Sequence, residues 1–227
     1  MVMSNEQPAT SEKVVLVTGA SSGIGAAIAT GLAAEGHHVV AAARRTDRLA
    51  QLAPPEAGSL TTRQLDVADR AAVTAAVQEI RAEHGRLDVI VNNAGVMPLS
   101  RLDALHVDEW NRMIDVNVRG LLHGIAAALP VFREQGGGHV VTIASVGAHE
   151  VAPTAAVYCG TKHAAWAITE GLRLEADPSI RVTTVSPGWS SPSSPTPSPI
   201  RSPPKRCGLT ERTPSLRTRS PPRCSTP

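Results

Sequence analysis

A glycine-rich turn stands between an uninterrupted apolar run and a helical pattern near the start of this 227-residue chain. The apolar run covers residues 14–17, the sequence TGASSGIG fills 18–25, and an alanine-rich helical pattern covers 24–35. Glycines permit a tight turn and let the backbone approach a phosphate closely, and the amino terminus of a helix attracts negative charge. This order of strand, turn and helix predicts a site for the pyrophosphate of a dinucleotide, with a glycine loop that binds no ligand as the alternative.

The alternation of strand-like runs and helical patterns continues along the chain. Further strand-like runs lie at 39–43, 60–65, 87–91, 140–143 and 181–185, and helical patterns lie at 46–52, 69–83, 108–133 and 153–175. Apolar runs without polar alternation are typical of strands that are buried on both faces. Thr46 and Asp69 are the expected N-caps of their helices. The pattern predicts an α/β fold over residues 13–188, with a doubly wound Rossmann-type parallel sheet.

The exit of the second expected strand indicates which nicotinamide cofactor the site prefers. A carboxylate about 20 residues past the glycines binds a ribose 2′-hydroxyl, whereas an arginine there accommodates a 2′-phosphate. Arg44 and Arg45 follow this strand, and Asp47 falls in the first turn of the next helix, where the helix dipole favours acids. The sequence therefore favours NADP(H) over NAD(H), unless both arginines are ordinary surface charges. Asp66, at the end of the third strand, is either a partner for the adenine amino group or a turn residue.

A second group of residues carries the candidate chemistry. Tyr158 and Lys162 lie four residues apart on an expected helix and share one face. A nearby ammonium lowers the pKa of a phenol, which is ordinarily near 10, and so makes the tyrosine usable as an acid or base. Ser145 follows the fifth expected strand, where its hydroxyl can hold a substrate oxygen. Asn117 lies within a helical pattern although asparagine is a poor helix former, which hints at a function. Each feature also has an interpretation without function. Tyr158 and Lys162 would then be a pair on a helix surface, Ser145 an ordinary loop residue, and NNAG at 92–95 a turn rich in asparagine and glycine.

Taken together, these segments resemble the short-chain dehydrogenase/reductase family. The matching pieces are TGASSGIG at 18–25, LDV at 65–67, NNAG at 92–95, Asn117, Ser145, YCGTK at 158–162 and SPG at 186–188, in the family's order and spacing. The resemblance implies reversible hydride transfer between NADP(H) and a secondary alcohol or ketone, and a homo-oligomer. The stretches NNAGVMPLS and DEWNRMIDVNV resemble the branch that acts on small hydroxy acids.

The resemblance also implies a role for each matching residue. Tyr158 would be the general acid/base, Lys162 would lower its pKa, Ser145 would orient the carbonyl, and Asn117 would hold a water in the proton relay. The residues implied to bind the cofactor are Thr18, Gly19, Ser21, Ser22, Gly23, Ile24, Gly25, Arg44, Arg45, Asp66, Val67, Asn93, Ala94, Gly95, Tyr158, Lys162, Pro187 and Gly188.

The αβ pattern stops after residue 188. Residues 189–227 contain ten of the chain's 18 prolines, and they carry seven Lys or Arg residues against one acid, Glu211. Such a segment buries too little apolar surface to offset its ordering entropy, so we expect a disordered tail there and a flexible leader at 1–12. The tail has no counterpart of the family's substrate-covering segment or of its usual last strand, which we expect to impair turnover. A frameshift and a natural extension are the two explanations.

Charge and cysteine content limit the remaining possibilities. The net charge is +2, and it becomes −4 without the tail's +6, which gives no reason to expect nucleic acid or an anionic membrane as partner. Three cysteines without paired spacing argue against disulfides and a metal site, and they favour a reducing, cytoplasmic location. The expected partner is a small-molecule substrate. A non-catalytic NADP(H)-binding protein is the second functional candidate.

Overall fold

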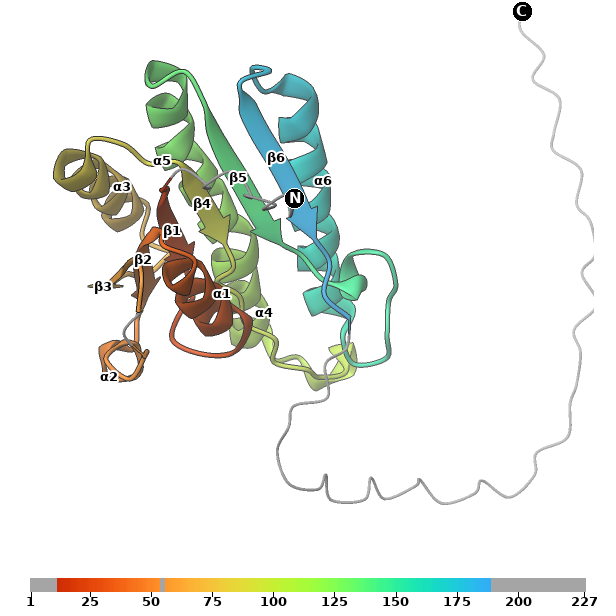
Figure 1. Cartoon of the computed structure of the whole chain (residues 1–227). Coiled ribbons are helices and arrows are strands. Elements are labelled where there is room, and N and C mark those ends of the chain that lie inside the picture. The colour runs from red at the N-terminus through yellow and green to blue at the C-terminus, as the bar shows by residue number, and fades with distance from the viewer. Residues whose placement is uncertain (1–11, 54–55, 189–227) are drawn as a thin grey trace, which may run out of the picture. The chain divides into compact units, whose positions relative to one another are not determined.

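The computed structural model describes residues 12–53 and 56–188, which form a parallel sheet flanked by helices (Figure 1). Six strands lie in the order β3-β2-β1-β4-β5-β6. The strands are β1 (Val14–Thr18), β2 (His38–Ala43), β3 (Ser59–Gln64), β4 (Val89–Asn92), β5 (Gly138–Ile143) and β6 (Ile180–Val185). The α-helices are α1 (Gly23–Ala34), α2 (Thr46–Leu49), α3 (Arg70–His84), α4 (Val107–Ile114), α5 (Gly120–Glu134) and α6 (Ala156–Glu175). The predicted doubly wound α/β fold is confirmed.

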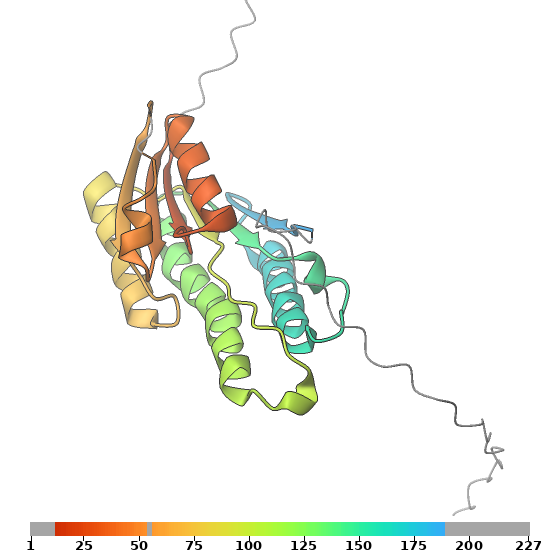
Figure 2. The same ribbon diagram turned by 90° about the horizontal axis from the view of Figure 1, so that it is seen from below.

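Alternate residues of β1 are buried on opposite faces of the sheet, as the unbroken apolar run predicted. Val14 and Leu16 belong to the core that contains residues of α3 and α5, whereas Val15 and Val17 belong to the core that contains residues of α1 and α2. Viewed from below, helices lie on both sides of the sheet (Figure 2). Ala, Val, Leu and Ile dominate these cores, and Phe132 is the only aromatic side chain among their described members.

The strand order reverses between β1 and β4, and this reversal positions the site. The chain runs outward from β1 to β3 and then returns to the other side of β1, where residues 15–17 pair with residues 89–91 of β4. At such a point the connections that leave neighbouring strands diverge and open a crevice at the carboxyl ends. The glycine turn follows β1 and the NNAG segment follows β4, so both lie at this edge.

Two predicted helix starts were wrong. The N-cap of α2 is Arg45, and Thr46 is the first helical residue. The helix expected from residue 153 begins at Ala156, because Thr154 has a φ of 68°, in the left-handed region that an α-helix cannot include. The short loop before α6 therefore has a sharper bend than its sequence indicated.

The helix predicted at 108–133 is also interrupted. It consists of α4 and α5, separated by the π-helical turn η2 (Asp115–Arg119). The predicted N-cap of α3 is confirmed, since the side chain of Asp69 accepts a hydrogen bond of 3.1 Å from the N–H of Ala72. Apart from Glu12, the predicted leader at 1–12 and the predicted tail at 189–227 lie outside the described residues. Within 12–53 and 56–188, no helix combines the length and hydrophobicity that crossing a membrane requires.

Candidate active site

The turn after β1 is held tightly against the segment that follows β4. Gly19 has a φ of +68°, and a Cβ atom there would lie 2.7 Å from the Cα of Ala94. A Cβ atom on Gly25 would lie 2.6 Å from the carbonyl oxygen of Gly19, and it would be closer still to Nδ2 of Asn93. Neither position accepts a side chain, the first because of conformation and crowding and the second because of crowding alone.

Thr18 and Asn93 fasten these two segments with hydrogen bonds. The hydroxyl of Thr18 donates to the carbonyl of Val91 at 3.1 Å and accepts from the N–H groups of Asn93 and Ala94 at 3.1 and 3.2 Å. Nδ2 of Asn93 donates to the carbonyl oxygens of Thr18 at 2.8 Å and Gly19 at 3.3 Å. These bonds fix the spacing of the two segments that border the crevice.

The amino terminus of α1 fits an anionic group. Its N-cap, Ser22, makes no side-chain capping hydrogen bond, and the first turn contains no acidic residue. The first N–H groups of a helix lack partners within the helix and carry the positive end of its dipole. Gly23 begins this helix, and Ile24 and Gly25 line the neighbouring cleft. A pyrophosphate placed here would meet unpaired N–H donors and no competing carboxylate.

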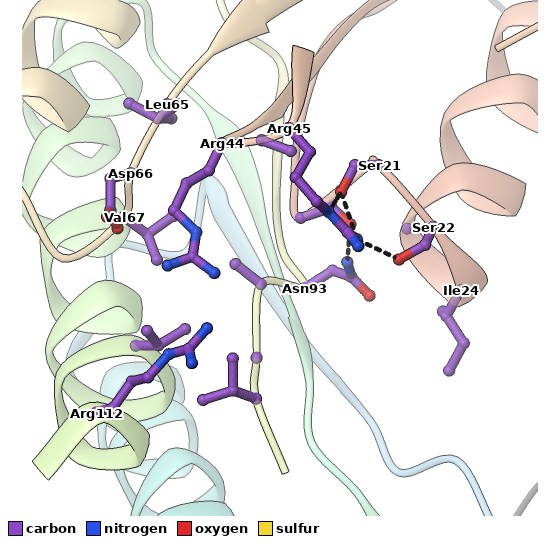
Figure 3. A pocket seen from close by; sticks show the side chains of 17 residues that line it. Ser21, Ser22, Ile24, Arg44, Arg45, Leu65, Asp66, Val67, Asn93 and Arg112 are labelled. Atoms are coloured by element: carbon purple, nitrogen blue, oxygen red, sulfur yellow. Dashed lines mark hydrogen bonds between the residues drawn. The ribbon is translucent and has the colours of Figure 1, made fainter. Parts of the chain in front are cut away.

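A cleft of about 420 Å³ opens at this edge of the sheet (Figure 3). It joins five segments that are distant from one another in the sequence. The predicted cofactor residues that line it are Gly19, Ser21, Ser22, Ile24, Gly25, Arg44, Arg45, Asp66, Val67, Asn93, Ala94 and Gly95. The cleft therefore brings together most of the residues that the sequence assigned to a dinucleotide.

Arg44 and Arg45 make one end of the cleft positive. The guanidinium of Arg45 donates to the hydroxyls of Ser21 and Ser22, each at 2.9 Å, whereas that of Arg44 extends into the open cleft (Figure 3). Neither arginine forms an ion pair with any of the residues described. Guanidinium groups bind phosphate oxygens strongly and with defined geometry, so this end of the cleft suits a phosphate.

Asp66 takes part in a turn and also lines the cleft. Its Oδ1 accepts a hydrogen bond of 3.0 Å from the N–H of Ala68, which makes an Asx turn. The same residue borders the cleft between Leu65 and Val67. The two readings of Asp66 are therefore compatible, because a carboxylate accepts several hydrogen bonds at once.

Lys162 is buried at the end of β5. Its Nζ donates to the carbonyl of Ile143 at 2.8 Å, and only 7% of the residue is exposed. Burial lowers the pKa of its ammonium group from 10.5 to about 8, because desolvation disfavours the charged form. A Cβ atom on Gly95 would lie 3.7 Å from this Nζ, so the amine stands next to the wall of the cleft.

Asn117 lies in the π-helical turn η2 and connects three parts of the site. Its Oδ1 accepts from the N–H of Val96 at 2.8 Å, and its Nδ2 donates to the carbonyl of Val96 at 2.9 Å and to Oγ1 of Thr161 at 3.0 Å. The hydroxyl of Thr161 in turn donates to the carbonyl of Tyr158 at 2.7 Å. A π-helical turn widens the backbone, and such turns are frequent at functional sites. The weak helix propensity noted in the sequence coincides with this interruption, and the water-holding role stays a prediction.

Ser145 and Tyr158 border the same small space beside Gly147. A Cβ atom on Gly147 would lie 3.3 Å from Cε1 of Tyr158 and 3.5 Å from Oγ of Ser145. Ser145 also caps the 3₁₀ turn η3 (Val146–Ala148) by accepting from the N–H of Gly147 at 3.1 Å. The carbonyl of Pro187 accepts from the N–H of Val146 at 2.9 Å, which brings the predicted SPG segment, with Gly188 at its end, to this loop.

Several residues of the site were not predicted. The cleft is also lined by Ala43, Leu65, Val96, Arg112 and Val116. Arg112 and Val116 are four residues apart, so their spacing signalled a shared helical face. The sequence did not indicate that this face meets the cleft, because that depends on how α4 and η2 pack against the sheet. Thr161, which links Asn117 to Tyr158, lay unnoticed inside the YCGTK segment.

A Rossmann-type sheet with a phosphate-binding turn at its reversal point, and with one helix that carries both a tyrosine and a buried lysine, defines a nucleotide-binding oxidoreductase. A model of the short chain dehydrogenase family matches residues 13–197. The chain is 47% identical over 181 residues to an uncharacterized oxidoreductase of Staphylococcus saprophyticus, a match that covers 78% of this chain and 74% of that protein. The chain belongs to the short-chain dehydrogenase family.

Solved structures agree with this assignment. An alcohol dehydrogenase of Thermococcus sibiricus, in complex with 5-hydroxy-NADP, superposes with a TM-score of 0.72 at 32% identity, and the match covers 78% of this chain and 76% of that one. A gluconate 5-dehydrogenase of Burkholderia cenocepacia, in complex with NADP and tartrate, gives a TM-score of 0.73 at 33% identity, with 78% and 71% covered. The described fold is thus that of short-chain dehydrogenases.

Proposed function

We propose that this chain transfers hydride between NADP(H) and a secondary alcohol or ketone, with small hydroxy acids among its substrates. The observation that carries the proposal is that Lys162, one turn after Tyr158 on α6, buries its amine next to Gly95 in the wall of the cofactor cleft. Ser145 borders the same space as the tyrosine ring. An acid/base, a hydrogen-bond donor and a cation therefore meet beside a site for a dinucleotide.

The chain's own side chains would handle the proton. During reduction, the hydroxyl of Tyr158 gives its proton to the substrate oxygen, and during oxidation the phenolate takes that proton back. The ammonium of Lys162 supplies a positive charge on the same helix face, and the hydroxyl of Ser145 donates to the substrate oxygen and holds it in place. Asn117 holds the loop after β4 against α6 and so positions both the lysine and the tyrosine. The bound nicotinamide supplies or accepts the hydride.

Arg44 and Arg45 support the preference for NADP(H). Both follow β2, where the ribose of a dinucleotide lies in this fold, and no carboxylate competes for them among the described ion pairs. The two solved structures named above contain NADP or a derivative of it, and one also contains tartrate, a hydroxy acid. These complexes support the cofactor and the substrate class for this chain by similarity.

The remaining proposals concern the context of the enzyme. We place it in the cytoplasm, as a homo-oligomer that binds neither nucleic acid nor membranes. The segment at 13–188 is proposed as the catalytic domain, and the tail at 189–227 lies outside the described residues. Sequencing of the gene around the codon for Trp189 tests the frameshift, because a coding sequence without a plausible alternative frame would exclude it.

The activity is tested by NADPH oxidation over a panel of ketones, aldehydes and keto acids, with the purified full chain. We expect slow oxidation with at least one carbonyl, and its loss in Tyr158→Phe, which keeps the ring but removes the transferable proton. NADPH binding without oxidation of any carbonyl would favour a non-catalytic NADP(H)-binding protein. Absence of NADPH binding would contradict both functions.

A further inference from the structure

The cofactor cleft contains a third arginine that the predicted functional residues do not include. Arg112 comes from α4, and its guanidinium points into the cleft from the side opposite the β2 exit, where Arg44 enters (Figure 3). A surface arginine on a helix ordinarily pairs with an acid three or four residues away. Asp108 is available at that spacing, yet no ion pair joins it to Arg112 within the described residues, and Asp115 pairs with Arg119 instead.

The surroundings of Arg112 differ from those of the arginines at the β2 exit. Val116, one helical turn further along, and Leu65 and Val67, after β3, give this side of the cleft an apolar wall. Asp66 lies between the last two and presents a carboxylate that can accept from an amino group. An apolar wall beside a single acceptor suits a flat heterocyclic base, whereas the two serines and Arg45 at the other end suit phosphate oxygens.

Arg112 and Arg44 bring two positive charges into this end of the cleft from its two sides. Arginine stacks well on aromatic faces, because the planar guanidinium combines its charge with a flat, weakly hydrated surface. The geometry therefore matches an adenine ring held between Arg112 and the β2 side of the cleft.

We propose that Arg112 contacts the adenine ring of the bound dinucleotide and contributes to the binding of NADPH and NADH alike. This inference rests on the proposed function, since it concerns the same cleft. The adenine is common to both cofactors, so the contribution of Arg112 is independent of the 2′-phosphate. Arg44 and Arg45, by contrast, stand where the 2′-phosphate would lie and favour NADPH alone.

The test is isothermal titration calorimetry of the full chain with NADPH, NADH and 5′-AMP, using Arg112→Met, which keeps most of the apolar stem. We expect the affinity for all three ligands to fall by a similar factor, about fivefold, which is the size of a partly solvated cation–π contact. Arg119→Met, an arginine of the neighbouring turn that does not line the cleft, is the matched control and should bind like the unmodified chain. Thermal melts of both variants establish that they are folded.

The outcomes separate the two proposals. A loss for NADPH alone would overturn the adenine contact, because Arg112 would then bind the 2′-phosphate. Unchanged binding of all three ligands by Arg112→Met would also overturn it, and would make Arg112 a surface charge. If the unmodified chain failed to bind NADPH and NADH, the proposed function would fail together with this assignment.

Discussion

Replacing Lys162 with methionine should stabilise the fold at neutral pH and abolish turnover. The native pKa of this lysine is about 8, below the ordinary 10.5, because burial penalises its charged form. At pH 7 the native protein therefore holds a buried ammonium at a cost in free energy. Methionine has a similar length, suits a buried site and carries no charge.

The magnitude follows from the two pKa values. At about 1.4 kcal/mol per pH unit, the interval between 10.5 and about 8 makes the penalty about 3 kcal/mol at pH 7, and about 1 kcal/mol at pH 9.5. The variant also loses the 2.8 Å hydrogen bond to the carbonyl of Ile143, at a cost of about 1 kcal/mol. We therefore expect Lys162→Met to be about 2 kcal/mol more stable than the unmodified chain at pH 7, with a Tm about 5 °C higher, and about equal to it at pH 9.5.

The direction in which the stability difference between the two proteins changes with pH tests whether Lys162 is a buried charge. Between about pH 8 and 10.5 the unfolded chain binds more protons at Lys162 than the native one, so this residue makes the stability of the unmodified chain rise with pH. Groups remote from Lys162 titrate alike in both proteins and cancel in the difference. Urea unfolding followed by circular dichroism at pH 7 and 9.5 measures it. A variant less stable by the same amount at both pH values would refute the buried-charge argument.

Three further predictions follow from the geometry. Tyr158→Phe should lower kcat by about 10²- to 10⁴-fold and leave the Kd for NADPH within about twofold, as steady-state kinetics and calorimetry would report, and retained turnover would exclude the tyrosine as acid/base. Gly25→Ala should destabilise the protein by about 1–3 kcal/mol and weaken NADPH binding, because the added Cβ atom would collide with backbone atoms. In the control Gly31→Ala, on the same helix, the added Cβ atom meets nothing within 4 Å and should stabilise the protein by about 0.5–1 kcal/mol. Equal effects of the two variants in urea unfolding would contradict the packing around Gly25. Asn117→Ala should cost about 2–3 kcal/mol of stability and lower kcat, because it leaves the N–H and carbonyl of Val96 without partners, and an unaffected thermal melt would show that the bridge is not structural.

The sequence predicted the sheet because its signals were local. The unbroken apolar run of β1 and the glycine turn after it act over a few residues, and β1 is buried on both faces as they indicated. The capping side chain of Asp69 likewise acts only on its own helix. Predicted helix boundaries were wrong where the backbone conformation depended on contacts distant in the sequence. Thr154, which has a positive φ although it is not glycine, is an example.

The candidate site could be predicted where its residues lie in short motifs directly after predicted strands. The glycine turn comes directly after β1 in the sequence, and Arg44 and Arg45 come directly after β2. Because parallel strands bring their carboxyl ends to one edge of the sheet, these residues were expected to lie together. Arg112 could not be found in this way, since its role depends on the direction in which α4 faces the cleft. The π-helical turn at Asn117 was also missed, although the poor helix propensity of that residue marked the position.

The most direct test of the central claim is the transfer of deuterium from the nicotinamide C4 position of deuterated NADPH to a carbonyl substrate in a single turnover, followed by mass spectrometry of the product. We expect the unmodified chain to form an alcohol that carries one deuterium, and Tyr158→Phe to form it about 10²- to 10⁴-fold more slowly although that variant still binds the cofactor. Labelled alcohol formed at the same rate by both proteins, or bound NADPH that yields labelled alcohol from neither, would contradict hydride transfer with Tyr158 as the acid/base.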